Sequence, residues 1–217
     1  MADFATSRTT MVDTQIRPSD VTKYPIIQAM LAIPREIFLP GGLRPVAYAD
    51  RDQPLEGGRY VLAPRSFAKM LDAANVGAED VVLDLGCGLG YSTAVLAHMA
   101  KTVVAVEENG SHAEDAQSAL SEAGVDNAAV IAGPMAAGEP KSGPYDVIMV
   151  QGAIETWPEA LTDQLCEGGR AVALWAEGHN CTARLGHKLD GRMIWRDLFS
   201  ASAPVLPGFA RVQEFAF

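Results

Sequence analysis

The stretch from Val81 to Tyr91, VVLDLGCGLGY, constrains the fold more than any other part of the chain. Its apolar start is typical of a buried strand, its alternating glycines predict a tight turn, and residues 92–100 have the composition of a helix. A strand, a glycine turn and a helix N-terminus in this order form a site for a nucleotide-type cofactor. We therefore expect an α/β domain built around such a site.

The pattern after this stretch predicts the type of sheet. Short apolar runs rich in β-branched residues occur at 81–83, 103–106, 129–131, 147–150 and 171–175. Helical segments near 92–100, 111–123 and 157–166 separate them. Such runs are typical of parallel strands covered on both faces, so the fold class is α/β, a doubly wound Rossmann-like sheet. Strand-like pieces at 193–195 and 211–217 predict an antiparallel edge.

The N-terminal part reads differently. Residues 11–39 have an amphipathic helical pattern, with Ser19 or Asp20 as a candidate N-cap and Pro34 as the expected end. Residues 40–64 are rich in Gly and Pro and form either a loop across the mouth of the domain or a surface connector.

A helix is expected over 64–75, with Pro64 in its first turn. The predicted organisation is an N-terminal helical and loop extension, residues 1–75, followed by the cofactor-binding domain, residues 76–217.

Composition excludes several classes of protein. A formal net charge of −10 over 217 residues, without a basic stripe, argues against a nucleic-acid partner. No apolar run is long enough to span a bilayer, and the first ten residues lack the apolar core of a secretory signal, so we expect a cytoplasmic protein. Neither a disulfide framework nor a metal site is expected from the scattered cysteines and histidines: Cys87, Cys166, Cys181, His98, His112, His179 and His187.

Three classes of cofactor are candidates for the glycine turn. A triphosphate loop needs a lysine after its last glycine, and none follows Gly90. A dinucleotide fingerprint needs Gly or Ala at its sixth position, where Tyr91 stands. The pattern present, Asp84-x-Gly86-x-Gly88-x-Gly90, is that of methyltransferases which bind S-adenosylmethionine.

The chemistry of the turn suits that ligand. S-adenosylmethionine carries no phosphate, so the turn needs no cation, and the helix N-terminus near Tyr91 favours its carboxylate. Asp84 can hold the ammonium group directly or through water. Glu107, at the end of the strand 103–106, can accept hydrogen bonds from both ribose hydroxyls. Cys87 is interpreted as a small residue packed beside the ligand, the alternative being a thiol whose pKa the helix N-terminus lowers.

With these residues in place, the chain resembles the protein-L-isoaspartate O-methyltransferase family almost from end to end. The N-terminal segments MVDTQIR and AMLAIPREIFLP are the most specific matches, because the glycine motif alone indicates only a methyltransferase. The matching segments are Met11–Arg17, Ala29–Pro40, Ala47–Asp50, Asp84–Leu96, Tyr145–Val150 and Gly168–Val172.

The resemblance implies an activity. The family transfers a methyl group from S-adenosylmethionine to the carboxylate of isoaspartyl residues in damaged proteins, and the ester then collapses to a succinimide that can reopen to aspartate. Because a carboxylate is already an anion at neutral pH, no strong general base is needed. The expected partner is a protein or peptide bearing isoaspartate, or a small carboxylate.

Two segments depart from the family pattern. The family has approximately GQTISxP where this chain reads GRYVLAP, so Tyr60, Val61 and Leu62 occupy the substrate-loop positions and the serine hydroxyl is lost at Leu62. Tyr60 can still donate a hydrogen bond, and Arg59 can attract a carboxylate. At the adenine, Pro134 and Met135 replace part of the family's Gly-Asp-Gly, which alters the contacts expected there.

These substitutions leave alternatives to isoaspartyl methylation. Leu62 favours a methyltransferase of the same fold with another acceptor. Leu62 and Pro134 together favour a catalytically silent protein that binds S-adenosylmethionine. A hydride-transfer enzyme is disfavoured by Tyr91.

Overall fold

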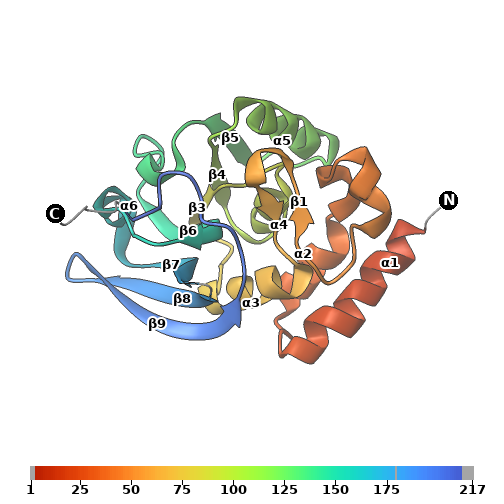
Figure 1. Cartoon of the computed structure of the whole chain (residues 1–217), viewed down its shortest axis with the longest axis horizontal. Helices are drawn as coiled ribbons and strands as arrows, with labels where there is room; N and C mark the ends of the chain where they lie inside the picture. Colours follow the sequence, from red (N-terminus) through yellow and green to blue (C-terminus); the bar gives the residue numbers. More distant parts are fainter. Residues whose placement is uncertain (1–2, 179, 212–217) are drawn as a thin grey trace.

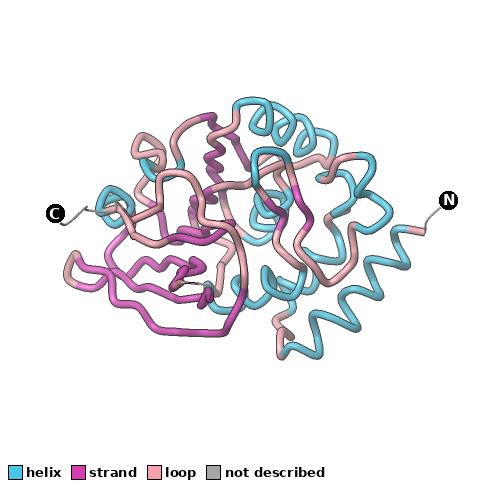
Figure 2. Tube along the Cα trace, viewed as in Figure 1, coloured by secondary structure: helices cyan, strands magenta, loops and turns pink. Residues whose placement is uncertain are grey.

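A computed structural model describes residues 3–178 and 180–211 of the chain. Its centre is a seven-stranded sheet in the order β5–β4–β3–β6–β7–β8–β9 (Figures 1 and 2). The first five strands in this order are parallel to one another. β8 runs antiparallel to β7, and β9 runs antiparallel to β8. The strands are β3 (Val81–Leu85), β4 (Thr102–Glu107), β5 (Ala128–Ala132), β6 (Tyr145–Ile154), β7 (Leu165–Glu177), β8 (Asn180–Leu189) and β9 (Arg192–Ala201).

The predicted doubly wound, mostly parallel sheet with an antiparallel edge is thus confirmed. The central strand β3 pairs with β4 on one side and β6 on the other. The strand order reverses at this point, and in open α/β sheets ligands bind at the carboxyl ends of the strands there. The glycine turn begins at that end of β3.

The parallel strands are buried on both faces. Val82 and Leu83, neighbours in β3, are both fully buried but belong to different apolar clusters. Val82 joins the cluster that holds the N-terminal helices, and Leu83 joins one with residues from α6 and the C-terminal loop. This arrangement explains why these strands appear in the sequence as continuous apolar runs.

Helices connect the strands on the two sides of the sheet. The expected helices at 64–75, 92–100 and 111–123 are present within one residue of their predicted ends. The helix expected at 157–166 is shorter, because residues from Leu165 onward pair with β6 instead. The helices are α3 (Pro64–Ala74), α4 (Tyr91–Met99), α5 (Gly110–Glu122) and α6 (Glu159–Gln164).

The N-terminal segment contains two helical stretches where one pattern was predicted. The first comprises α1 (Phe4–Met11), a π-helical turn over Val12–Ile16 and a 3-10 turn over Arg17–Ser19. The prediction of Ser19 or Asp20 as an N-cap is wrong, because Asp20 ends this stretch in the left-handed region at φ 65°. The second, α2 (Tyr24–Ala32), ends before Pro34 as expected.

Short elements make up the loop segment between α2 and α3. Two 3-10 helices, Arg35–Phe38 and Gly41–Val46, lead into a small hairpin formed by β1 (Gln53–Pro54) and β2 (Tyr60–Val61). Figure 1 shows this hairpin in front of α4. It carries the predicted substrate-loop residues Tyr60 and Val61.

The antiparallel edge is larger than expected. The piece predicted at 193–195 lies within β9, whereas β8 was not predicted because it contains no continuous apolar run of the kind that marked the parallel strands. Trp195 of β9 packs edge-on against Trp157 and Trp175, with ring centroids 5.0 and 5.2 Å apart. The piece predicted at 211–217 lies outside the described residues from position 212 onward.

Candidate active site

Three glycines allow the turn after β3 to bend away from the sheet. Gly86, Gly88 and Gly90 have φ values of 80°, 58° and 96°, in the left-handed region that favours glycine. The Gly86 amide donates to the carbonyl of Val106 at 2.8 Å, which fixes the turn against β4. Gly90 precedes the first residue of α4, so the N-terminus of that helix faces the turn.

Asp84 is buried beneath this turn and is fully hydrogen-bonded. Its Oδ2 accepts from the hydroxyls of Ser92 and Thr93, each at 2.7 Å, and its Oδ1 accepts from Gln151 Nε2 at 2.7 Å. Burial raises the pKa of this carboxyl, although the three hydrogen bonds act in the opposite direction. Asp84 has no exposed surface. The structure therefore favours an indirect contact between Asp84 and a ligand ammonium group, through a side chain or a water molecule that lies between them.

Glu107 stands at the end of β4 and faces the same turn. Its Oε2 accepts from the Gly88 amide at 2.8 Å, and its Oε1 accepts from the Asn109 amide at 3.2 Å. Its position beside the glycine turn is the one that the sequence predicted for a ribose-binding acid.

Arg59 is the side chain that meets Glu107. Its Nη2 lies 3.2 Å from Glu107 Oε2 and donates to the Gly86 carbonyl at 2.7 Å. Its Nη1 lies 3.2 Å from the sulfur of Met135. The two charged side chains are 6% and 1% exposed, so this is a buried ion pair that joins the hairpin to the glycine turn.

The predicted substrate-loop residues share a cavity with the turn. Tyr60, Val61 and Leu62 line a cavity of about 10 Å³ on one side. The lining on the other side is formed by Gly86, Cys87, Tyr91, Ser92, Gln151 and Phe67. The structure therefore brings the two predicted groups of site residues together, although they lie in separate segments of the sequence. A volume of this size holds about one water molecule.

Arg35 fixes the backbone of the substrate loop. It is fully buried and donates from Nε to the Ala47 carbonyl and from Nη2 to the Leu62 carbonyl, both at 2.8 Å. Its guanidinium also lies over the Tyr91 ring, 4.6 Å from the centroid. Burial lowers the pKa of Arg35 and raises that of Tyr91. Arg35, in the segment Pro34–Glu36, thus holds the Leu62 backbone in place beside α4.

The remaining predicted residues lie around the same turn. Met135 is fully buried at the start of a 3-10 helix (Met135–Ala137), and Pro134 precedes it. Burial raises the pKa of the Cys87 thiol well above its ordinary value, which contradicts an activated thiolate and agrees with a packed small residue. Ser92, Thr93 and Gln151 were not predicted as site residues. The only feature of the sequence that could have indicated them is their position next to predicted residues or motifs.

The polar groups around the glycine turn fit S-adenosylmethionine, but side chains occupy the space above the turn. A Cβ on Gly86 would lie 2.6 Å from Arg59 Nη2 and 3.3 Å from Leu206 Cδ1, and one on Gly88 would lie 2.7 Å from Leu55 Cδ1. All three are ends of flexible side chains. Because sites for ligands of this size measure about 300–1,000 Å³, the cofactor requires these side chains to move.

Comparison with known proteins identifies the family. The sequence model of "Protein-L-isoaspartate(D-aspartate) O-methyltransferase (PCMT)" matches residues 6–201. The chain belongs to this family. A protein-L-isoaspartate O-methyltransferase of Koribacter versatilis is 38% identical over 172 residues, 79% of this chain and 78% of that protein. One from Methylorubrum extorquens is 36% identical over 95% of this chain and 91% of that protein.

Solved structures agree with this assignment. A protein-L-isoaspartate O-methyltransferase structure has a TM-score of 0.83 at 26% identity, covering 93% of this chain and 66% of that chain. A family member from Plasmodium falciparum, in complex with S-adenosyl-L-homocysteine, has a TM-score of 0.78 at 18% identity, a likeness of fold alone. As a member of the family, the protein is an S-adenosylmethionine-dependent methyltransferase with a Rossmann-like fold.

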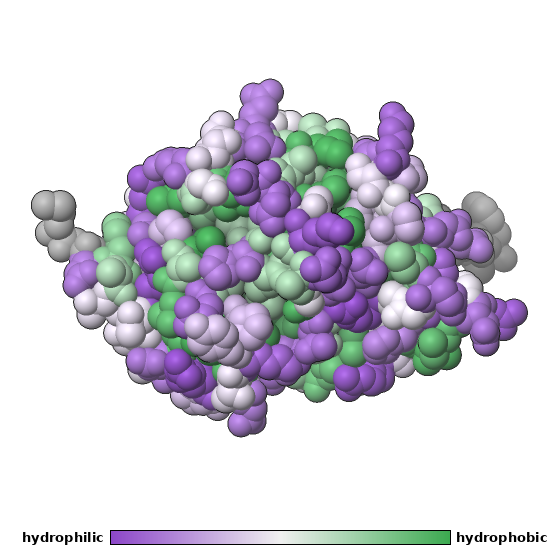
Figure 3. All heavy atoms as spheres, turned by 180° about the vertical axis from the view of Figure 1, so that it is seen from behind, coloured by the Kyte–Doolittle hydropathy of each residue, from purple (hydrophilic) through white to green (hydrophobic). Residues whose placement is uncertain are grey.

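Polar and apolar side chains are interspersed on the face seen in Figure 3. No helix in the described ranges is long and apolar enough to cross a membrane. Within residues 3–178 and 180–211, no group of three or more His, Cys, Asp or Glu side chains is arranged to hold a metal ion.

Proposed function

We propose that this protein transfers the methyl group of S-adenosylmethionine to the side-chain carboxylate of isoaspartyl residues in damaged proteins. The observation that carries the proposal is the shared cavity between Tyr60–Leu62 and the glycine turn. A carboxylate bound at the loop would face a cofactor bound at the turn. Family membership over residues 6–201 supports the same acceptor.

The reaction requires no general acid or general base from the protein. When bound, S-adenosylmethionine supplies an electrophilic methyl group, which a carboxylate oxygen takes with its own lone pair while the carbon–sulfur electrons stay on sulfur. The products are a methyl ester and S-adenosylhomocysteine, and no proton is transferred. The contribution of the protein is therefore to align the two reactants and to exclude water.

Each predicted residue has a role in this scheme. Glu107 would accept from the ribose hydroxyls, and the α4 N-terminus at Tyr91 would attract the ligand carboxylate. The backbone at Gly86, Gly88 and Gly90 would allow close approach. Asp84 orients Ser92 and Gln151 toward the cofactor. Met135, Cys87 and Pro134 would line the place of the adenine.

On the acceptor side, the serine hydroxyl is absent at Leu62, and Tyr60 is the loop residue that can still donate a hydrogen bond. Losing a buried hydrogen bond to a charged group costs on the order of 1.5–3 kcal/mol, roughly ten- to a hundredfold in rate or affinity. We therefore expect a slower enzyme than relatives with the serine, and not an inactive one.

The natural substrate is proposed to be a protein, with small carboxylates and nucleic acid as poorer candidates. An isoaspartyl peptide should serve as a minimal acceptor because the reacting group is a single side chain. The thiols of Cys87, Cys166 and Cys181 are unpaired by disulfides, which suits the reducing cytoplasm where we place the protein.

Methyl transfer to matched peptides tests the proposal. Purified protein is incubated with methyl-labelled S-adenosylmethionine and either an isoaspartyl peptide or its aspartyl twin. We expect base-labile label in the isoaspartyl peptide alone. Label in neither peptide, despite measurable cofactor binding, would favour another acceptor or a silent binding protein.

A further inference from the structure

Arg59 occupies the place that the proposed function gives to the cofactor. Its Nη2 lies over the backbone of the glycine turn, where it donates to the Gly86 carbonyl at 2.7 Å and meets Glu107 at 3.2 Å. The ribose hydroxyls need the same carboxylate. Arg59 and the ribose therefore cannot hold Glu107 in this way at the same time.

We propose that Arg59 binds the carboxylate of the methyl acceptor, and that the cofactor releases it for this role by taking its place on Glu107. This inference rests on the proposed function and deepens it by naming the residue that recognises the substrate. It also predicts an order of binding, with the cofactor before the substrate.

The charges at the site fit such an exchange. Glu107 is 1% exposed on its side chain, and a buried carboxylate that loses its cation is strongly destabilised. S-adenosylmethionine and S-adenosylhomocysteine both bring an ammonium group to the Asp84 side of the site and neutral hydroxyl donors to Glu107, and S-adenosylmethionine adds a positive sulfonium. The site therefore keeps a cation near Glu107 and Asp84 when Arg59 leaves.

The hairpin that carries Arg59 has open space beside its glycines, which leaves room for a local change of backbone conformation. Gly57 and Gly58 precede it with φ values of 68° and 73°, and no atom lies within 4 Å of a Cβ built on either. The strands on each side are two residues long, and the turn itself is closed by the Leu55 amide donating to the Arg59 carbonyl at 2.7 Å. A change confined to these residues can move the guanidinium without disturbing the core.

The neighbourhood of Arg59 supports a carboxylate ligand. Tyr60, Val61 and Leu62 follow it directly and line the cavity at the turn, so a released guanidinium stays beside the acceptor position. Its Nε is buried without a hydrogen-bond partner and is free to complete a two-point contact with a carboxylate. Arg35, the other buried guanidinium near Leu62, also has one unpartnered nitrogen, Nη1, but its Nε and Nη2 hold it on the Ala47 and Leu62 carbonyls.

The test measures cofactor binding and peptide binding separately by calorimetry. Arg59→Gln should bind S-adenosylhomocysteine about tenfold more tightly than the wild type, because the competing contact is gone. With S-adenosylmethionine, it should raise KM for the isoaspartyl peptide about tenfold while kcat changes little. Arg59→Lys should lie between the two, since it keeps the charge but not the planar fork.

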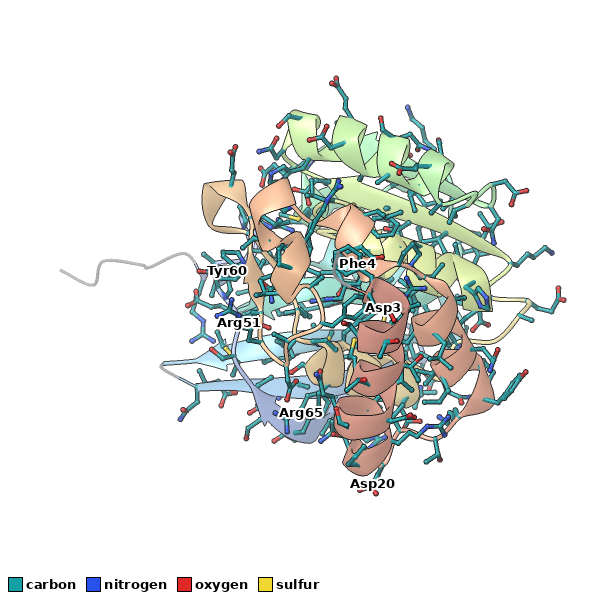
Figure 4. The ribbon with its side chains drawn as sticks, turned by 90° about the vertical axis from the view of Figure 1, so that its right-hand side faces the viewer. Asp3, Phe4, Asp20, Arg51, Tyr60 and Arg65 are labelled. Carbon is teal, nitrogen blue, oxygen red and sulfur yellow. The ribbon has the colours of Figure 1, made fainter. Side chains whose placement is uncertain are left out.

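Arg51→Gln is the matched control. Arg51 is exposed and lies near Tyr60 at the same edge of the molecule (Figure 4). Its loss changes the net charge equally and should leave both affinities unchanged. An Arg59→Gln protein that binds S-adenosylhomocysteine no more tightly than the wild type would overturn the proposal.

Wild-type protein provides a second measurement that needs no variant. S-adenosylhomocysteine should raise the affinity for the isoaspartyl peptide at least about tenfold. Equal peptide affinity with and without it would overturn the inference even if methyl transfer occurs. Tighter cofactor binding by Arg59→Gln without any transfer to isoaspartate would instead overturn the proposed acceptor and keep the exchange at Glu107.

Discussion

Leu62 is the residue at which this chain departs most clearly from its family's substrate loop. Its side chain is 3% exposed and lines the cavity at the glycine turn, so a serine hydroxyl introduced there would face the acceptor position. We predict that Leu62→Ser raises kcat/KM for an isoaspartyl peptide roughly ten- to a hundredfold relative to Leu62→Ala.

The alanine variant is the correct reference for this prediction. Both substitutions remove a buried Leu side chain and should lower the free energy of unfolding by about 2–5 kcal/mol. Only the serine adds a hydroxyl. Equal kcat/KM values for the two variants would show that the lost hydroxyl does not limit transfer to isoaspartate.

Asp84 gives the stability of the protein a specific pH dependence. Burial raises the pKa of the folded carboxyl above its ordinary 3.8, so in the window between these two values the folded state binds more protons than the unfolded state. The contribution of Asp84 to stability therefore improves as the pH falls through that window.

Asp84→Asn removes this titration and preserves the shape of the side chain. We predict that the unfolding free energy of the wild type, relative to that of Asp84→Asn, increases as the pH falls from neutral toward 3.8, the ordinary pKa of the carboxyl. Urea unfolding of both proteins across this range measures the difference, in which the other carboxyls cancel. A difference that is independent of pH would contradict the raised pKa.

At the scale of elements, Gly90 sets the distance between α4 and α5. Its φ is 96°, and a Cβ there would lie 3.3 Å from the Ala116 Cβ and 3.4 Å from the Ala116 carbonyl oxygen. We predict that Gly90→Ala lowers the free energy of unfolding by about 1–3 kcal/mol, because the backbone is strained and α5 is pushed outward.

Gly110→Ala is the control for this substitution. Gly110 begins α5, and no atom lies within 4 Å of its built Cβ. Alanine there should be neutral or stabilising by up to about 1 kcal/mol. Thermal unfolding compares the two variants, and equal losses at both glycines would show that contact with α5 is not the cause.

Prediction from sequence succeeded where local chemistry decides the structure. The continuous apolar runs predicted the parallel strands, and the glycines predicted the turn at Gly86–Gly90. The break after Asp20 was missed because the helical pattern continues across it, and β8 was missed because it contains no continuous apolar run. The meeting of Arg59 with Glu107 depends on how the hairpin folds over β4, which no local pattern encodes.

At the scale of the whole molecule, the N-terminal segment and the sheet share one apolar core. The cluster that contains Met11, Ile16 and Met30 also contains Val82, Val147 and Leu185. We therefore predict that residues 1–75 and 76–217 unfold together, although their sequence patterns differ.

Two probes can follow this transition independently. All three tryptophans lie between positions 157 and 195, so their fluorescence reports on the C-terminal part, whereas far-UV circular dichroism also reports on α1, α2 and α3. Urea midpoints from the two probes should coincide. An earlier transition by circular dichroism would indicate that the N-terminal segment unfolds on its own.

The fate of an isoaspartyl peptide in the presence of this protein and S-adenosylmethionine tests the proposed function most directly. Chromatography with mass detection over time should show the methyl ester first, then the succinimide formed by loss of methanol, then the aspartyl peptide. One S-adenosylhomocysteine should appear for each ester formed, and the aspartyl twin should remain unchanged. An isoaspartyl peptide that stays intact while the protein demonstrably binds the cofactor would contradict the proposed function.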